Sequence, residues 1–297
     1  MRRYFFVLLF LLLLTGCAGN NIPSGEKYLS PLPVKHAQVD DLNFGYRVFG
    51  KGEPLLMIMG FAGTMDIWDA EFIRTLAKKH TVIIFDNRGM GSTTAGKQRI
   101  TIQGMAEDAA GLTEALGYTK VHVLGWSMGG LIAQELALTH PEKVDKLILM
   151  GTSCSNTAVA DTTRRLMSMD IKELLSHFFP AAWLKLHPEA LAELPRPAQK
   201  TDPDIISAQA EAMTYWPGTC SKLHELKNNT LIISGTADDI LPEKLSMELA
   251  EGIEASWLAR YRHAGHWLMY QDPEGLARTV NNFLAVDEDM LDQRGRK

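Results

Sequence analysis

One serine lies where the sequence predicts a sharp turn from a strand into a helix. Ser127 is the third residue of Gly-Trp-Ser-Met-Gly-Gly, which spans residues 125–130. The apolar residues of 121–124 predict a buried strand, and the apolar spacing over 131–137 predicts a helix. A serine on such a turn has strained backbone and an exposed hydroxyl, while the glycines let strand and helix approach closely. Ser127 is therefore a candidate nucleophile, but this short pattern is common by chance and requires partners.

Two later loops offer the partners that a serine nucleophile needs. A serine hydroxyl is weakly nucleophilic by itself, so it requires a base that is oriented by a carboxylate. Asp238 follows a predicted strand over 231–234, and His266 follows a predicted strand near 256–261. Because the carboxyl ends of parallel strands lie along one edge of a sheet, we expect both residues to converge with Ser127.

Neighbouring residues leave alternatives open for these roles. Asp239 is the alternative acid, in which case Asp238 would cap the following helix. His263 is the alternative base and is otherwise interpreted as a surface residue. His122 lies within a predicted strand and is interpreted as a core histidine.

Alternating strands and helices are predicted to position these loops. A hairpin is expected over 36–48, followed by strands that alternate with helices as far as residue 150. This order predicts an α/β fold with a mostly parallel, doubly wound sheet of about eight strands and right-handed crossovers. Between Gly151 and Asn229 the alternation breaks into proline-interrupted amphipathic helices, which predict an inserted helical cap. Alternation then resumes as far as Leu284.

The first residues have the composition of a bacterial targeting segment. Arg2 and Arg3 precede an apolar run over 4–14, which Leu-Thr-Gly-Cys closes at residues 14–17. These four residues resemble a bacterial lipobox, and the resemblance implies cleavage before Cys17 and attachment of lipid to that cysteine. An ordinary secretory signal is the alternative. Because Ala18 stands where an aspartate would favour inner-membrane retention, the outer membrane is expected if the host is Gram-negative.

These features divide the chain into five predicted parts. Proline, glycine and serine over 20–33 indicate a tether between the lipid and the folded domain. The parts are a signal peptide (1–16), the lipidated cysteine and tether (17–35), an α/β core (36–150 and 230–286), the helical cap (151–229) and a charged tail (287–297).

Composition and cysteine usage restrict the classes of partner. The formal net charge is −5, and the sequence has no basic stripe interleaved with aromatic residues. No nucleic acid partner is therefore expected. No Cys/His spacing matches a structural zinc site, and no complete dinucleotide fingerprint occurs, so neither a metal nor a cofactor is implied. Cys154 and Cys220 are interpreted as buried free thiols, with a disulfide as the alternative in an oxidising compartment.

The order serine, aspartate, histidine, with these flanks, resembles the α/β-hydrolase fold superfamily over residues 39–284. The resemblance implies that Ser127 is the nucleophile, Asp238 the acid and His266 the base. The turn at residues 86–92 also matches the family, which favours a structural role for Arg88.

One loop departs from the family's pattern. It begins Met59-Gly60-Phe61, where the family usually has His-Gly. The resemblance implies that the backbone N–H groups of Phe61 and Met128 form the oxyanion hole. Because such donors belong to the backbone, losing the histidine need not abolish the hole.

The resemblance implies a serine hydrolase that acts through an acyl-enzyme, and the apolar residues of the predicted cap favour a small or medium apolar carboxylic ester as its substrate. Aminopeptidases, lactonases, cofactor-free peroxidases and acyltransferases use the same triad, and a non-catalytic surface binding module is an alternative of another class. Apolar residues of the predicted cap either line an acyl pocket or pack in a core. They are Met167, Met169, Phe178, Phe179 and Trp183.

Overall fold

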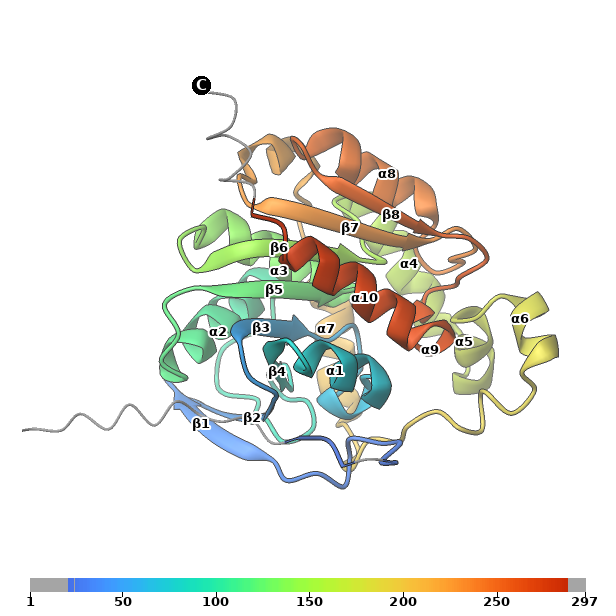
Figure 1. Ribbon diagram of the computed structural model, residues 1–297, viewed down its shortest axis with the longest axis horizontal. Helices are drawn as coiled ribbons and strands as arrows, with labels where there is room; N and C mark the ends of the chain where they lie inside the picture. Colours follow the sequence, from blue (N-terminus) through green and yellow to red (C-terminus); the bar gives the residue numbers. More distant parts are fainter. Residues whose placement is uncertain (1–20, 24, 288–297) are drawn as a thin grey trace, which may run out of the picture.

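A twisted sheet occupies the centre of the computed structural model, which describes residues 21–23 and 25–287 (Figure 1). Its eight strands run in the order β1-β2-β4-β3-β5-β6-β7-β8. Strand β2 pairs antiparallel with β1 and β4, and every other neighbouring pair is parallel. The strands are β1 (Lys35–Val39), β2 (Leu42–Phe49), β3 (Glu53–Ile58), β4 (His80–Phe85), β5 (Val121–Trp126), β6 (Val144–Met150), β7 (Asn229–Gly235) and β8 (Trp257–Tyr261). The predicted α/β fold class is confirmed.

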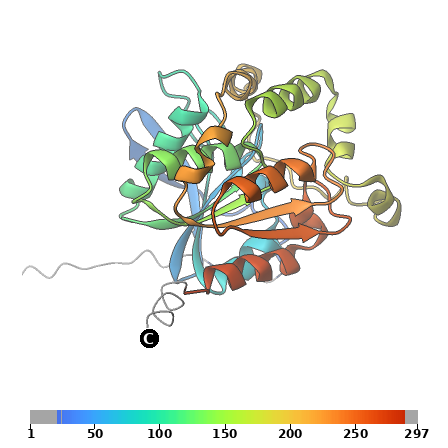
Figure 2. The same ribbon diagram turned by 90° about the horizontal axis from the view of Figure 1, so that it is seen from above.

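Helices cover both faces of this sheet, as Figure 2 shows. One face packs against α2 (Ile102–Ala115), α3 (Met128–Thr139) and α8 (Glu243–Gly252). The other face packs against α1 (Ala70–Ala77), α9 (Leu268–Gln271) and α10 (Pro273–Leu284). Because the central strands are buried on both faces, they read as nearly continuous apolar runs rather than as alternating ones.

The chain between β6 and β7 forms helices and no strand, and we call residues 151–228 the helical insertion. Ser155, Asp170 and Asp202 accept hydrogen bonds from backbone N–H groups at the starts of three of these helices, which fixes where the helices begin. The helices are α4 (Asn156–Ser168), α5 (Ile171–His177), α6 (Ala181–Leu186), α7 (Pro203–Thr214) and the 3₁₀ helix η2 (Cys220–Glu225).

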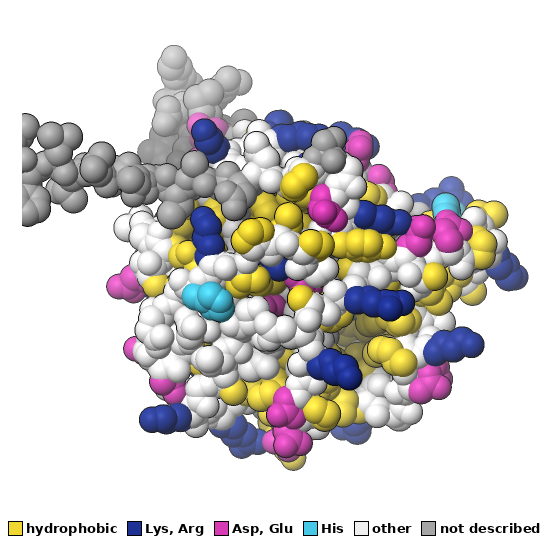
Figure 3. All heavy atoms as spheres, turned by 90° about the horizontal axis from the view of Figure 1, so that it is seen from below, with side chains coloured by type: hydrophobic (Ala, Val, Ile, Leu, Met, Phe, Trp, Pro, Cys, Tyr) yellow, Lys and Arg dark blue, Asp and Glu magenta, His cyan; other side chains and the backbone are white. Residues whose placement is uncertain are grey.

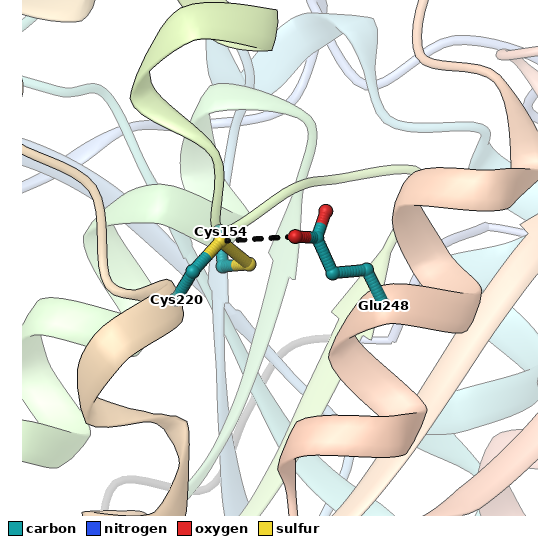
Figure 4. A group of neighbouring side chains, drawn as sticks. All are labelled: Cys154, Cys220 and Glu248. Atoms are coloured by element: carbon teal, nitrogen blue, oxygen red, sulfur yellow. Dashed lines mark hydrogen bonds between the residues drawn. A yellow bond between two sulfur atoms is a disulfide. The ribbon is translucent and has the colours of Figure 1, made fainter.

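A disulfide joins Cys154 to Cys220, so the expectation of free thiols is wrong (Figure 4). The two Cα atoms are 4.8 Å apart although the residues are separated by 66 positions. Their side chains meet because the chain enters and leaves the helical insertion at the same place, which periodicity in the sequence does not reveal. Glu248 of α8 lies beside the bridge, 3.6 Å from the Cys220 sulfur.

The described residues before β1 pack against the domain instead of forming a free tether. Leu29 is fully buried, and Ile22 is 6 % exposed. The Arg74 guanidinium of α1 donates a hydrogen bond to the Glu26 carbonyl at 2.6 Å. Lys27 forms an ion pair with Glu193 of the helical insertion at 2.7 Å. The sequence suggested a tether because Ile22 and Leu29 are isolated apolar residues without periodicity in a segment that contains several prolines.

The signal peptide, Cys17 and residues 288–297 of the predicted charged tail lie outside the described residues. Within the residues that the structure describes, no helix is both long enough and apolar enough to cross a membrane. Figure 3 shows basic and acidic side chains interspersed over the face that it draws, without a large patch of one sign.

Two histidines lie side by side where β4 and β5 begin. His80 is 6 % exposed, and its ring lies edge-on to that of His122 at 6.2 Å between centroids. Among the described residues, neither ring nitrogen of His80 makes a hydrogen bond of ordinary geometry, although the Asn281 side chain lies near enough to oppose part of the pKa shift. Burial, followed by the neighbouring His122, lowers the pKa of His80 below its usual 6.5. The folded environment of His80 therefore favours its neutral form.

We expect the free energy of unfolding to fall as the pH drops below 6.5. His80 then binds a proton more readily in the unfolded chain than in the folded protein, where its pKa is lower. His80→Leu should make the free energy of unfolding depend less on pH between about pH 7 and 5, because the group that the unfolded chain protonates is gone. Urea unfolding over that range measures it. His224→Gln, at an exposed histidine, is the control, and an unchanged pH slope in His80→Leu would contradict the prediction.

Opening the disulfide should lower the free energy of unfolding by about 2–4 kcal/mol, because the bridge restricts the unfolded chain. We expect this loss in Cys154→Ala/Cys220→Ala and in reduced wild-type protein. Denaturant unfolding with and without reductant measures it, while the alkylation count verifies reduction. Reductant should have no effect on the double variant. Equal stability of oxidised and fully reduced wild type would refute the prediction.

Candidate active site

Ser127 lies on a tight turn between β5 and α3. Its backbone has φ 56° and ψ −122°, in a region that residues other than glycine seldom adopt. The Ser127 N–H donates to the Met150 carbonyl at 2.9 Å, and the Thr152 hydroxyl donates to the Ser127 carbonyl at 2.8 Å. A Cβ added at Gly129 would lie 2.0 Å from the Ile58 carbonyl oxygen, so only glycine fits there. The structure therefore contains the sharp turn that the motif predicts.

Three of the predicted site residues form one hydrogen-bonded line. His266 Nε2 lies 3.0 Å from Ser127 Oγ, and His266 Nδ1 lies 2.7 Å from Asp238 Oδ2. Each of the three residues is less than 9 % exposed. These distances let the imidazole take a proton from the hydroxyl while the carboxylate stabilises the resulting imidazolium.

Asp238 and His266 are held in place by further contacts. Asp238 Oδ1 accepts hydrogen bonds from the N–H groups of Ile240 and Leu241 at 2.8 and 2.9 Å. The Trp126 indole donates to the His266 carbonyl at 3.0 Å. The bonds to Oδ1 fix the orientation of the Asp238 carboxylate and leave its Oδ2 facing the imidazole.

The ring of Phe178 covers His266. The Phe178 and His266 rings are stacked at 5.6 Å between centroids, and Phe178 also stacks on Trp267 at 4.4 Å. The backbone N–H of Trp267 donates to the Phe178 carbonyl at 3.1 Å. Contact with the helical insertion thus restricts the imidazole from a side that sequence spacing could not identify.

The alternative residues lie elsewhere. Asp239 has a 61 % exposed side chain that contacts the imidazole of His177 and forms an ion pair with Arg165. His263 is exposed, and its backbone N–H bonds to Thr236. His122 is buried near the beginning of β5, at the edge of the sheet opposite Ser127.

The predicted oxyanion residues both lie next to Ser127. Met128 is the first residue of α3, so its N–H has no intrahelical acceptor. Phe61 follows Gly60, where an added Cβ would lie 3.0 Å from the Ser127 Cβ. Beyond Phe61, Ala62 has φ 55°, a left-handed conformation that costs a residue other than glycine about 1–2 kcal/mol.

The turn that follows β4 is structural in its contacts. Arg88 and Asp108 form a buried two-pronged ion pair, with Nε to Oδ2 at 2.6 Å. Asp86 accepts hydrogen bonds from the N–H groups of Met65 and Ser92 at 2.7 and 2.8 Å. Burial raises the pKa of the Asp86 carboxyl to about 6, and these two N–H groups partly oppose the shift.

A cavity of about 610 Å³ opens onto Ser127 and His266. Most of its wall is apolar, and much of the wall comes from the helical insertion. Among the described residues of this lining, Arg196 is the one Lys, Arg, Asp or Glu. Apolar contributors from the insertion include Leu166, Ile171, Leu174, Leu175, Phe178 and Leu191.

Only part of the predicted acyl pocket belongs to this cavity. Phe178 lines it, whereas Phe179 and Trp183 line a separate cavity of about 260 Å³. Met167 is 48 % exposed, and Met169 is half-buried outside both linings. The sequence did not single out Arg196 or the leucines of α5 as lining residues. The spacing of these leucines is the same as that of ordinary core residues in a helix.

Comparison with known proteins agrees with this geometry. Residues 53–182 match the model of the alpha/beta hydrolase fold family. Residues 1–18 match a prokaryotic membrane lipoprotein lipid attachment site, which confirms the predicted lipoprotein signal.

Similar proteins cover most of the chain. A 2-hydroxymuconate semialdehyde hydrolase of Pseudomonas putida is 30 % identical over 260 residues, covering 80 % of this chain and 88 % of the relative. A protein of Azorhizobium caulinodans named "Putative carbamate hydrolase RutD" is 28 % identical over 248 residues, covering 78 % of this chain and 91 % of the relative. A solved α/β hydrolase fold protein from Chitinophaga pinensis has 27 % identity and a TM-score of 0.76, covering 87 % and 99 %. The chain therefore belongs to the α/β hydrolase fold family of enzymes.

Proposed function

We propose that this protein is a serine hydrolase that cleaves a small or medium apolar carboxylic ester through an acyl-enzyme. The observation that carries the proposal is the line from Asp238 through His266 to the Ser127 hydroxyl, at 2.7 and 3.0 Å, at the wall of an apolar cavity. A nucleophile, a base and a group that orients the base are the parts that acyl transfer requires.

The proposed reaction has two half-reactions. His266 Nε2 takes the Ser127 proton while Oγ attacks the ester carbonyl, and Asp238 stabilises the imidazolium. The N–H groups of Phe61 and Met128 bind the developing oxyanion. The C–O bond of the ester breaks as His266 returns the proton to the leaving alcohol. Water, activated by the same histidine, then releases the acid from the acyl-serine.

The apolar lining of the cavity favours an apolar acyl group. Similar proteins are named as a semialdehyde hydrolase and a carbamate hydrolase, so the names of relatives with this fold refer to different substrates. Amide, lactone, peroxidase and acyl-transfer chemistry with the same residues are therefore arms of the substrate test. A non-catalytic binding module has no use for a buried, hydrogen-bonded serine, histidine and aspartate.

The proposal includes a location and a division of the chain. Signal peptidase would cleave before Cys17, lipid would anchor the enzyme in the cell envelope, and Ala18 favours the outer membrane of a Gram-negative host. The helical insertion would act as a cap, because its side chains form much of the cavity wall.

Ser127→Ala should lower kcat/KM on short nitrophenyl esters by roughly 10⁴-fold, because the nucleophile is lost. Asp238→Asn and His266→Gln should cause comparable losses, whereas Asp239→Asn and His263→Asn are matched controls that retain most activity. A fluorophosphonate probe should label wild type at Ser127. Unimpaired turnover by Ser127→Ala, or no labelling of correctly folded wild type, would sink the proposal. A panel of esters, lactones and amino-acid amides then identifies the substrate class.

Cys17→Ser should move the protein out of the membrane fraction, because it removes the proposed acceptor of the lipid. Fractionation, together with metabolic labelling by a radioactive fatty acid, measures this. Cys220→Ala is the control, since its thiol has another partner, and it should remain labelled. Equal labelling of Cys17→Ser and wild type would show that the lipid is attached elsewhere.

A further inference from the structure

The loop that carries Phe61 is supported by side chains from outside itself. It connects β3 to the 3₁₀ helix η1 (Met65–Ile67). At its start, the Asn87 amide donates to the Met59 carbonyl at 3.1 Å. At its end, Asp86 accepts from the Met65 N–H at 2.7 Å. Between these points lies Ala62, whose left-handed conformation glycine would adopt more readily.

Gln209 of α7 binds the loop at this residue. Its Oε1 accepts a hydrogen bond from the Ala62 N–H at 3.0 Å, across 147 residues of sequence. Gln209 is fully buried. Its Nε2 has no hydrogen-bond partner among the described residues, which is costly for a buried amide. An apolar side chain of similar size would avoid that cost, so the bond to Ala62 accounts for an amide at this position.

Helix α7 is itself held firmly enough to serve as a support. Ala212 and Met213 belong to the core cluster on the α3 face of the sheet. The Ile205 side chain lies against Gly89, where an added Cβ would be 2.8 Å from it. Gln209 therefore projects from a helix that is anchored both to the core and to the turn after β4.

We propose that Gln209 is a positioning residue that holds Ala62 in its left-handed conformation and thereby sets the Phe61 N–H beside Ser127. The inference rests on the proposed function, in which that N–H binds the oxyanion. It also accounts for a loop without the family's usual histidine: support comes from the helical insertion, so the oxyanion hole is complete only when α7 is docked.

Gln209→Met, which fills the same space without an acceptor, tests this proposal. We expect kcat on a short nitrophenyl ester to fall about tenfold or more with KM within about twofold, because an interaction made only in the transition state is weakened. The rate of labelling by the fluorophosphonate probe should fall in parallel. Gln209→Asn, whose shorter amide stops short of Ala62, is measured beside it in case the methionine variant does not fold. Ser207→Ala, at an exposed position of the same helix, is the matched control.

A second substitution separates positioning of the loop from a general loss of packing. Ala62→Gly in the Gln209→Met background should recover at least about threefold in kcat, because glycine reaches a positive φ without help. Unchanged kcat in the folded Gln209 variants would overturn the proposal, as would a rise in KM alone or no recovery with glycine. If wild type is not labelled at Ser127, the proposed function fails; if it is labelled normally and the Gln209 variants match it, only this inference fails.

Discussion

The close packing of the turn at Ser127 against the backbones of neighbouring strands is the constraint on which the rest of the site depends. Two hydrogen bonds hold Ser127 at φ 56°. Its N–H donates to the carbonyl of Met150, the last residue of the neighbouring strand β6, and its carbonyl accepts from the hydroxyl of Thr152, just beyond that strand. Gly129 in turn lies directly on the Ile58 carbonyl of β3. Three adjacent parallel strands thus hold one strained residue, so its hydroxyl emerges at the carboxyl edge of the sheet.

The same edge gathers groups from distant parts of the chain. Asp238 follows β7 and His266 follows β8, and the parallel register of these strands brings both loops to the level of Ser127. The site is buried and apolar around its polar line, which strengthens each hydrogen bond within it. The backbone of the sheet supplies this arrangement.

Several separate contacts hold the helical insertion in place. The disulfide joins its two ends, Gln209 reaches the loop of Phe61, and Phe178 stacks on His266. The segment that precedes β1 also contacts it, through Lys27 and Glu193. The cavity over Ser127 has walls from the loop after β3, from the helical insertion and from the loops after β7 and β8.

The sequence by itself determined the alternation of strands and helices, the turn at Ser127 and the loops that carry Asp238 and His266. These are local patterns, since periodicity and glycine placement reflect burial and backbone conformation of nearby residues. Only the tertiary structure decided that Asp238 rather than Asp239 faces the imidazole, that Cys154 meets Cys220, and that Gln209 bonds to Ala62. Each of these depends on the direction of a side chain or on contact across many residues, and a linear pattern contains neither.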